Sequence, residues 1–319
     1  MHYTSPENIH KVIDPLFLDA LYQELDEIRS AEGVTEKKRR KALEEFRNKI
    51  GSMRFLDPAC GSGNFLTESF LSLRQLEDDV LNELHRGQVE IVFETPDNDR
   101  RVSLDQFYGI EINDFACRVA KTALWIAQLQ ANNESESMLD VSIEDFPLKD
   151  SANIVCGNAL RMNWNDVLQA EKCNYIIGNP PFNGARTMSE AQKEEIKDVA
   201  AGVSNNHDLD YVSGWYVKTL DMMEVNSHIK AALVSTNSIT QGAQAADLWN
   251  YVLGERGAVI SFAWRTFIWN NESIDEAHVH CVIVGFQKEK SEKRLLVEAD
   301  GTTLSPENIN GYLLPMDNF

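Results

Sequence analysis

The chain has 319 residues, 43% of them hydrophobic, which is enough to bury one large core or two smaller ones and excludes a disordered chain. Its 30 basic and 50 acidic residues give a net charge of −20, which is unfavourable for direct contact with nucleic-acid phosphates. No apolar run approaches about 18 residues, the start has no apolar signal segment, and the five cysteines form no Cys-x-x-Cys pair. We therefore expect a cytoplasmic protein with no membrane contact, no disulfide framework and no metal site.

Residues 1–53 are predicted to form an N-terminal helical segment. Apolar residues recur at helical spacing over 8–30, which predicts an amphipathic helix, and a charged helix is predicted over 35–50. The basic run at 37–41 could contact DNA, although the acidic residues around it favour a solvated helix face with paired charges. Residues 54–319 carry 21 basic and 40 acidic groups, so nearly all of the acidic excess lies in this second portion.

A Gly-rich turn follows the first predicted strand. Residues 54–66 read Arg-Phe-Leu-Asp-Pro-Ala-Cys-Gly-Ser-Gly-Asn-Phe-Leu, so an apolar strand runs into Asp57 and a helix is predicted over 64–85. Glycines allow a sharp bend and a close approach to a ligand, and the helix N-terminus offers free N–H groups. The third glycine of the dinucleotide fingerprint and the Gly-Lys-Ser/Thr of a P-loop are both lacking.

Two further strand ends carry polar residues. Residues 107–113, Phe-Tyr-Gly-Ile-Glu-Ile-Asn, predict a strand that ends in Glu111, and an acid at this place can bind two ribose hydroxyls. Such an acid usually follows the Gly-rich turn by about 20 residues, so an insertion is expected, and residues 87–103 fit one. The alternative for Glu111 is a solvated strand end. A helix over 113–130 and a third strand over 154–159 follow, and the latter ends near Asn158.

The most specific motif is Asn179-Pro180-Pro181-Phe182, which directly follows an apolar run. The Asn179 side-chain oxygen and the Pro180 carbonyl can both accept hydrogen bonds from one amino group. The two prolines fix φ, so these acceptors are held stiffly, and Phe182 offers a flat face on which a base could stack. The alternative is a strand that ends in a Pro-Pro turn with a packed Phe.

The rest of the chain continues the alternation of strands and helices. A long polar loop is predicted over 183–208. Beyond it, helices are predicted over 209–225 and 244–255, and strands over 229–235, 257–264 and 278–286, with a further edge at 293–298. This alternation predicts an α/β fold with a doubly wound, mostly parallel sheet and an antiparallel edge strand. Ligands bind such sheets at the carboxyl ends of the strands, where the polar motifs are expected to lie.

Together, the Gly-rich turn, the acidic strand end, the Gly-Asn pair at 157–158 and the Asn-Pro-Pro-Phe motif resemble the class I S-adenosylmethionine-dependent methyltransferases. Their order is similar to the gamma arrangement of DNA adenine-N6 methyltransferases. Residues 2–9, His-Tyr-Thr-Ser-Pro-Glu-Asn-Ile, resemble the segment that covers the methionine end of the cofactor in this family. Within the family the likeness is to the methyltransferase portion of type IIG/IIL restriction–modification proteins. The resemblance implies a Rossmann-like sheet of seven strands, with residues 54–319 as the catalytic domain.

The resemblance also implies a role for each matching position. The implied cofactor is S-adenosyl-L-methionine, and the residues expected to bind it are Thr4, Asp57, Ala59, Cys60, Gly61, Gly63, Asn64, Glu111, Ile112 and Asn158. Among these, Glu111 would bind the ribose, Ile112 would flank the adenine ring and Asn158 would face its amino edge. The residues expected to be catalytic are Asn179, Pro180, Pro181 and Phe182, and the aromatic residues expected to stack on the target base are Phe182 and either Trp269 or Phe267. A core role for the last two aromatic residues stays open, and no metal is implied.

The implied activity is methylation of adenine N6 in duplex DNA by base flipping, within a restriction–modification system. The acidic charge fits a chain from which the target-recognition domain is absent, so duplex DNA is the expected partner through such a domain, and the loop 183–208 is expected to order only over DNA. Cytosine-N4 methylation is a second chemistry on DNA that the motifs leave open. A protein-glutamine N5 methyltransferase and a non-catalytic cofactor-binding or scaffold protein also stay open, as does the oligomeric state.

Overall fold

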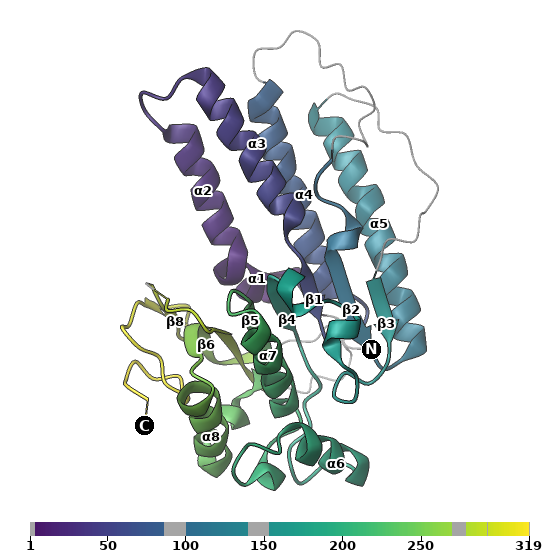
Figure 1. Ribbon diagram of the computed structural model, residues 1–319, viewed down its shortest axis with the longest axis vertical. Coiled ribbons are helices and arrows are strands. Elements are labelled where there is room, and N and C mark those ends of the chain that lie inside the picture. The colour runs from purple at the N-terminus through teal and green to yellow at the C-terminus, as the bar shows by residue number, and fades with distance from the viewer. Residues whose placement is uncertain (1–3, 86–99, 140–152, 270–278, 292, 319) are drawn as a thin grey trace.

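One β-sheet runs through the molecule (Figure 1). The computed structural model describes residues 4–85, 100–139, 153–269, 279–291 and 293–318. The strands in these residues are β1 (Phe55–Asp57), β2 (Phe107–Glu111), β3 (Asn153–Cys156), β4 (Tyr175–Gly178), β5 (Lys230–Thr236), β6 (Val259–Trp269), β7 (Val279–Gln287), β8 (Leu295–Val297) and β9 (Thr303–Leu304). Their order across the sheet is β3-β2-β1-β4-β5-β7-β6-β8-β9.

The sheet is doubly wound and mostly parallel, which confirms the predicted fold class. Strands β1 to β5 pair in parallel, so their carboxyl ends meet at one edge of the sheet. Strand β7 runs antiparallel to both β5 and β6 and lies between them, so β6 runs parallel to β5 and ends at the same edge. Strand β8 pairs in parallel with β6, and the antiparallel strand at the edge of the sheet is β9. These two strands extend the sheet beyond the seven strands that the resemblance implies.

Helices cover both faces of the sheet (Figure 1). The α-helices of the described residues are α1 (Pro6–Ile13), α2 (Asp19–Ser30), α3 (Glu36–Ser52), α4 (Asn64–His85), α5 (Asp114–Leu139), α6 (Glu190–Val199), α7 (Ser213–Val225) and α8 (Gly242–Trp249). Successive strand residues point to opposite faces. Leu56 and Ile176 belong to a core with α7 and α8, whereas Phe55 and Ile177 belong to a core with α1 to α5.

The helix predicted over 8–30 is interrupted. Helix α1 ends at Ile13, a π-helical turn spans Asp14–Leu18, and α2 begins at Asp19. Pro15 lies in this turn, and because proline has no N–H the regular helical hydrogen bond cannot form there. The ring of Phe17, from the same turn, packs 5.1 Å from the ring of Phe55 in β1. The N-terminal helices therefore share a core with the sheet.

The polar stretch 183–208 is not a plain loop. It contains α6 and a short 3-10 turn at Asn206–Asp208. Ser189 and Gln192 form a capping box at the start of α6, and Ile196 of this helix is buried. The expectation of a loop that orders only over DNA is therefore wrong for this segment. The strand and turn expected within the insertion at 87–103 lie outside the described residues, which include only positions 100–103 of the insertion.

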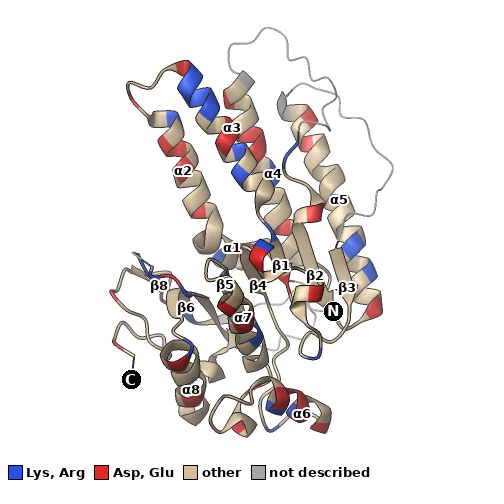
Figure 2. Cartoon of the chain, in the orientation of Figure 1, with Lys and Arg blue, Asp and Glu red and all other residues tan. Residues whose placement is uncertain are grey.

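The basic run at 37–41 lies far from the carboxyl edge of the sheet. It opens α3, and Figure 2 shows these blue residues at the end of the helix away from the strands. Helix α3 leads into the start of β1, whose other end carries the Gly-rich turn. Lys41 lies 3.4 Å from Glu45 on the same helix. This placement favours the solvated helix face over a DNA contact.

Candidate functional site

The Gly-rich turn (residues 58–63) connects β1 to α4 at the carboxyl edge of the sheet. Gly61 and Gly63 have φ angles of +54° and +86°, in the left-handed region that glycine adopts without strain. A Cβ at Gly63 would lie 3.1 Å from the Cβ of Ala120 on α5, whereas a Cβ at Gly61 would meet nothing within 4 Å. Gly63 thus permits close packing on α5, and Gly61 leaves open space beside the turn.

Cys60 holds the turn on β2. Its N–H donates to the Ile110 carbonyl at 3.0 Å, and its side chain is buried against Gly109, where a Cβ would lie 2.8 Å from Sγ. Burial raises the pKa of the Cys60 thiol well above its ordinary value, and the nearby Asp57 and Glu111 raise it further. The thiol is therefore protonated, as suits a wall residue rather than a nucleophile.

Asp57 ends β1 as a buried carboxyl group, only 1% exposed. Its Oδ1 accepts from the Ala59 N–H at 3.0 Å, while its Oδ2 is buried and has no partner among the described residues. Burial raises the pKa of Asp57 to about 8, with a further rise from the charge of Glu111 and an opposing effect of the Ala59 hydrogen bond. A buried acceptor without a donor is costly, so this atom suits a ligand that donates or carries positive charge.

Glu111 ends β2 and connects to the Gly-rich turn. Its Oε2 accepts from the Gly61 N–H at 3.0 Å, and its Oε1 accepts from the Asn113 N–H at 2.8 Å. Each oxygen keeps a second lone pair, so the carboxylate can still accept from two hydroxyl groups. Ile112, the next residue, is 67% exposed and presents an apolar side chain beside this carboxylate.

The Asn-Pro-Pro-Phe motif opens a loop at the end of β4, here named the NPPF loop (residues 179–187). Gly178 brings this loop against β1, because a Cβ at Gly178 would lie 2.6 Å from Asp57 Oδ1. The side-chain oxygen of Asn179 is buried and has no hydrogen-bond partner among the described residues. Pro180 is buried and Pro181 is exposed. Two buried acceptors without donors, on Asp57 and Asn179, therefore lie on adjacent strand ends.

Two of the three aromatic residues expected to stack on a base share one hydrophobic core. Phe182 is half-buried and packs against the same core as Phe267. The ring of Phe267 lies 5.4 Å from Lys11 Nζ on α1. The backbone of Trp269 pairs with Val279 at the carboxyl edge, but its side chain lies outside the described part of the chain. The choice between Phe267 and Trp269 stays a prediction.

Asn158 follows β3, and both ends of its side-chain amide are occupied. Its Nδ2 donates to Glu195 Oε1 at 2.8 Å, and its Oδ1 accepts from the Leu160 N–H at 2.9 Å. Glu195, buried on α6, also accepts from Arg161 Nε at 2.7 Å and from the Tyr211 hydroxyl. Burial and this last hydrogen bond raise the pKa of Tyr211, so the hydroxyl remains a donor. Contact of Asn158 with an adenine amino group stays a prediction.

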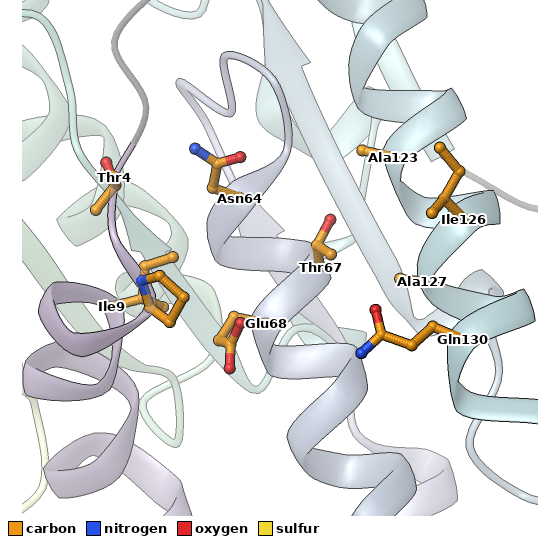
Figure 3. A pocket seen from close by; sticks show the side chains of 10 residues that line it. Thr4, Ile9, Asn64, Thr67, Glu68, Ala123, Ile126, Ala127 and Gln130 are labelled. Carbon is orange, nitrogen blue, oxygen red and sulfur yellow. The ribbon is translucent and has the colours of Figure 1, made fainter. Parts of the chain in front are cut away.

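A cavity of about 230 Å³ lies beside the Gly-rich turn, between α1, α4 and α5 (Figure 3). Its lining residues are Thr4, Pro6, Ile9, Asn64, Thr67, Glu68, Ala123, Ile126, Ala127 and Gln130. Thr4 is buried and Asn64 begins α4, so two of the expected cofactor residues line this cavity. Asp57 and Glu111 do not line it. The buried carboxyl and amide oxygens that have no partner among the described residues lie instead on Asp57 and Asn179.

Two carboxyl groups at the site, Glu195 and Asp210, were missed in the sequence. Glu195 belongs to the stretch predicted as a loop, where the capping box at 189–192 was the local signal that a helix begins. Asp210 lies in the helix predicted over 209–225, where no local pattern marked it as a site residue. Across the ranges the structure describes, no cluster of three His, Cys, Asp or Glu residues could hold a metal ion. Across the same ranges, no helix is long and apolar enough to cross a bilayer.

Comparison with known proteins gives matches over nearly the whole chain. Residues 33–298 match the family model described as MmeI, DNA-methyltransferase domain. DNA methyltransferase A of Bacillus subtilis (strain 168) is 37% identical over 100% of this chain, which spans 35% of that relative. The type IIL restriction–modification enzyme MmeI, solved in complex with DNA, is 39% identical with a TM-score of 0.92 over 98% of this chain, which spans 41% of that protein.

A more distant structure, the DrdV–DNA complex, is 14% identical with a TM-score of 0.53 over 93% of this chain and shares the fold. The chain thus spans well under half the length of both DNA methyltransferase A and MmeI. These matches agree with the resemblance seen in the motifs, and they imply a methyl donor. The chain belongs to the MmeI DNA-methyltransferase domain family.

Proposed function

We propose that this chain transfers a methyl group from S-adenosyl-L-methionine to the N6 amino group of adenine in DNA. The observation that carries the proposal is the buried side-chain oxygen of Asn179, which has no partner in the described part of the chain. Gly178 brings this acceptor next to Asp57, which is the buried acid beside the Gly-rich turn. An acceptor for an amino group therefore lies beside the buried acid of the Gly-rich turn, in a chain whose family implies a methyl donor.

The residues at the strand ends suit this cofactor. The unpaired Oδ2 of Asp57 would accept from its ammonium group, and Glu111 would accept from its ribose hydroxyls. The other residues proposed to line its site are Thr4, Ala59, Cys60, Gly61, Gly63, Asn64, Ile112 and Asn158. When bound, S-adenosyl-L-methionine supplies an electrophilic methyl group on a sulfonium.

The NPPF loop would orient the nucleophile. Asn179 Oδ1 and the Pro180 carbonyl would accept both hydrogens of the target amino group, which leaves its nitrogen lone pair free to attack. Pro181 would keep the turn stiff, and Phe182 would stack on the base. A base inside a duplex cannot reach these groups, so the reaction requires base flipping.

DNA is the preferred substrate because of the relatives, whose names state DNA methylation or a complex with DNA. The acidic charge of residues 54–319 disfavours tight phosphate contact by these residues alone, so we attribute sequence recognition to a separate domain. A place in a restriction–modification system and a cytoplasmic location stay predictions.

Replacing Asn179 tests the proposal directly. With Asn179→Ala, methyl transfer should fall by about a hundred- to a thousandfold, the effect of losing one preorganised hydrogen-bond partner, while cofactor affinity stays within a few fold. Asn179→Asp should retain part of the activity because it keeps an acceptor oxygen. Transfer of labelled methyl groups to duplex DNA and calorimetry of cofactor binding measure the two effects.

The exposed Asn133 on α5 provides the matched control, since Asn133→Ala should change neither quantity. Unchanged turnover in Asn179→Ala would refute the assignment. Label that enters a glutamine-containing release factor and not DNA would show that the protein substrate is the correct one. Mass spectrometry of the DNA distinguishes N6-methyladenine from N4-methylcytosine.

A further inference from the structure

Asp210, three residues before the start of α7, connects the NPPF loop to two other elements. Its Oδ1 accepts from the Ala185 N–H at 3.1 Å, and its Oδ2 accepts from the Ser238 hydroxyl. Its own N–H donates to Gln244 Oε1 at 2.9 Å. Ser238 lies in the 3-10 turn at the end of β5, and Gln244 lies on α8. One carboxylate therefore ties the NPPF loop to the neighbouring strand end.

The next residues extend these contacts to the Gly-rich turn. The Tyr211 N–H donates to the Asn183 carbonyl at 2.8 Å, one residue after Phe182. The Tyr211 ring packs edge-on against Trp215 at 5.3 Å, and Trp215 Nε1 donates to the Pro58 carbonyl at 3.0 Å. Residues 210–215 thus contact both halves of the site.

The first residues of the NPPF loop have few hydrogen-bond donors of their own. Pro180 and Pro181 have no N–H, so they cannot donate to any acceptor. Asp210 is only 6% exposed, and a buried carboxylate that accepts from two donors forms strong, charge-assisted hydrogen bonds. Loss of the carboxylate would leave the Ala185 N–H without its partner and would free the loop on the side that follows Phe182.

We infer that Asp210 is a positioning residue for methyl transfer. It is not among the residues proposed to touch the base or the cofactor, and it acts through the Ala185 N–H by holding residues 183–187 and hence Asn179 against the Gly-rich turn. The kinetic part of this inference rests on the proposed function. The structural part, that Asp210 holds the loop, stands independently of any activity.

Three variants of the full chain test both parts. Asp210→Ala removes both acceptors, whereas Asp210→Asn can still accept from Ala185 through Oδ1 and donate to Ser238 through Nδ2. The exposed Asp208, two residues earlier, gives the control Asp208→Ala. Hydrogen–deuterium exchange of peptides over 183–189 should be about 10- to 100-fold faster in Asp210→Ala, the effect of losing a hydrogen bond to a charged group, and near wild type in the other two.

Kinetics then separate positioning from folding. In Asp210→Ala, kcat should fall by about 10- to 100-fold while the cofactor Kd stays unchanged, and Asp210→Asn should recover most of this loss. If Asp210→Ala does not fold, Ala185→Pro removes the donor and leaves the carboxylate. Ala185 is the second residue of a turn closed by the Thr187 N–H to the Gly184 carbonyl at 2.9 Å, where proline fits.

Each outcome decides a part of the inference. Unchanged exchange over 183–189 overturns the holding role of Asp210. Faster exchange with an unchanged kcat overturns the positioning role. Faster exchange in a protein whose wild type methylates no acceptor supports the holding role and shows that the proposed function is the part that fails.

Discussion

The two loops that meet at the site are held in different ways. The Gly-rich turn is held by the strand ends beside it: Asp57 accepts from the Ala59 N–H, and Glu111 accepts from the Gly61 N–H, both at 3.0 Å. The NPPF loop is held by a residue that ends no strand, because Ala185 donates to Asp210 in the segment that leads into α7. The acids that would bind the cofactor therefore also hold the Gly-rich turn in place, whereas the residues that would bind the base depend on Asp210, which lies in another segment.

The largest effect is expected from replacing Glu111, which holds the Gly-rich turn and is proposed to bind the cofactor. Glu111→Ala removes the acceptor of the Gly61 N–H and the proposed acceptor of both ribose hydroxyls, so cofactor affinity should fall by about a hundredfold or more. Calorimetry measures this loss, with Asp114→Ala as the control because Asp114 is an exposed acid at the start of α5. Affinity within twofold of wild type would mean that the turn is not held as described.

Asp57 should make cofactor binding depend on pH. Burial raises its pKa to about 8, so below that pH the ligand-free carboxyl is mostly protonated, and pairing with an ammonium group would expel the proton. Affinity should then rise by up to about tenfold per pH unit from pH 6 and level off above pH 8. Calorimetry at several pH values measures the slope. An equally steep slope in Asp57→Asn would assign the effect to another group.

The same pKa shift affects stability in the opposite direction, because the free energy of unfolding should fall with rising pH while cofactor affinity should rise. The folded chain keeps a proton that the unfolded chain releases above its ordinary pKa of 3.8, so the contribution of Asp57 to the free energy of unfolding falls as pH rises from 3.8 to about 8. Asp57→Asn removes this dependence, and thermal unfolding at the two ends of that range measures it.

A smaller effect is expected from the glycines of the turn. Gly63→Ala should lower the free energy of unfolding by about 2–3 kcal/mol, because its positive φ costs about 1–2 kcal/mol and its Cβ would press on Ala120. Gly61→Ala is the matched control: it shares the positive φ but meets nothing within 4 Å, so it should cost less. Equal losses in thermal or denaturant unfolding would show that the contact with Ala120 is unimportant.

The sequence predicted the parts of the site that local rules determine. The strand ends at Asp57, Glu111 and Asn179 were placed at one edge because parallel strands share their carboxyl edge. The strand order beyond β5 could not be predicted from the sequence. Strand β7 lies between β5 and β6, and this antiparallel pairing is set by tertiary packing and not by any local signal.

The partners of the site residues could not be predicted for the same reason. Asn158 donates to Glu195 and Ala185 to Asp210, and these pairs are 37 and 25 residues apart in the chain. Neither pair has a local pattern that marks it. Helix α6, by contrast, had a local signal, because a Ser-x-x-Gln capping box begins it. The polar composition of the stretch led to the prediction of a loop despite that signal.

The contact between Gly178 and Asp57 has a consequence for exchanging segments between relatives. The two positions are 121 residues apart in the chain, yet the space that a methyl group would need at one is filled by the carboxyl oxygen of the other. Chimeric proteins that take one of these motifs from a homologue and the other from this chain should tolerate the graft only when the donor also has glycine before its asparagine. The two motifs therefore form one steric unit across adjacent strand ends.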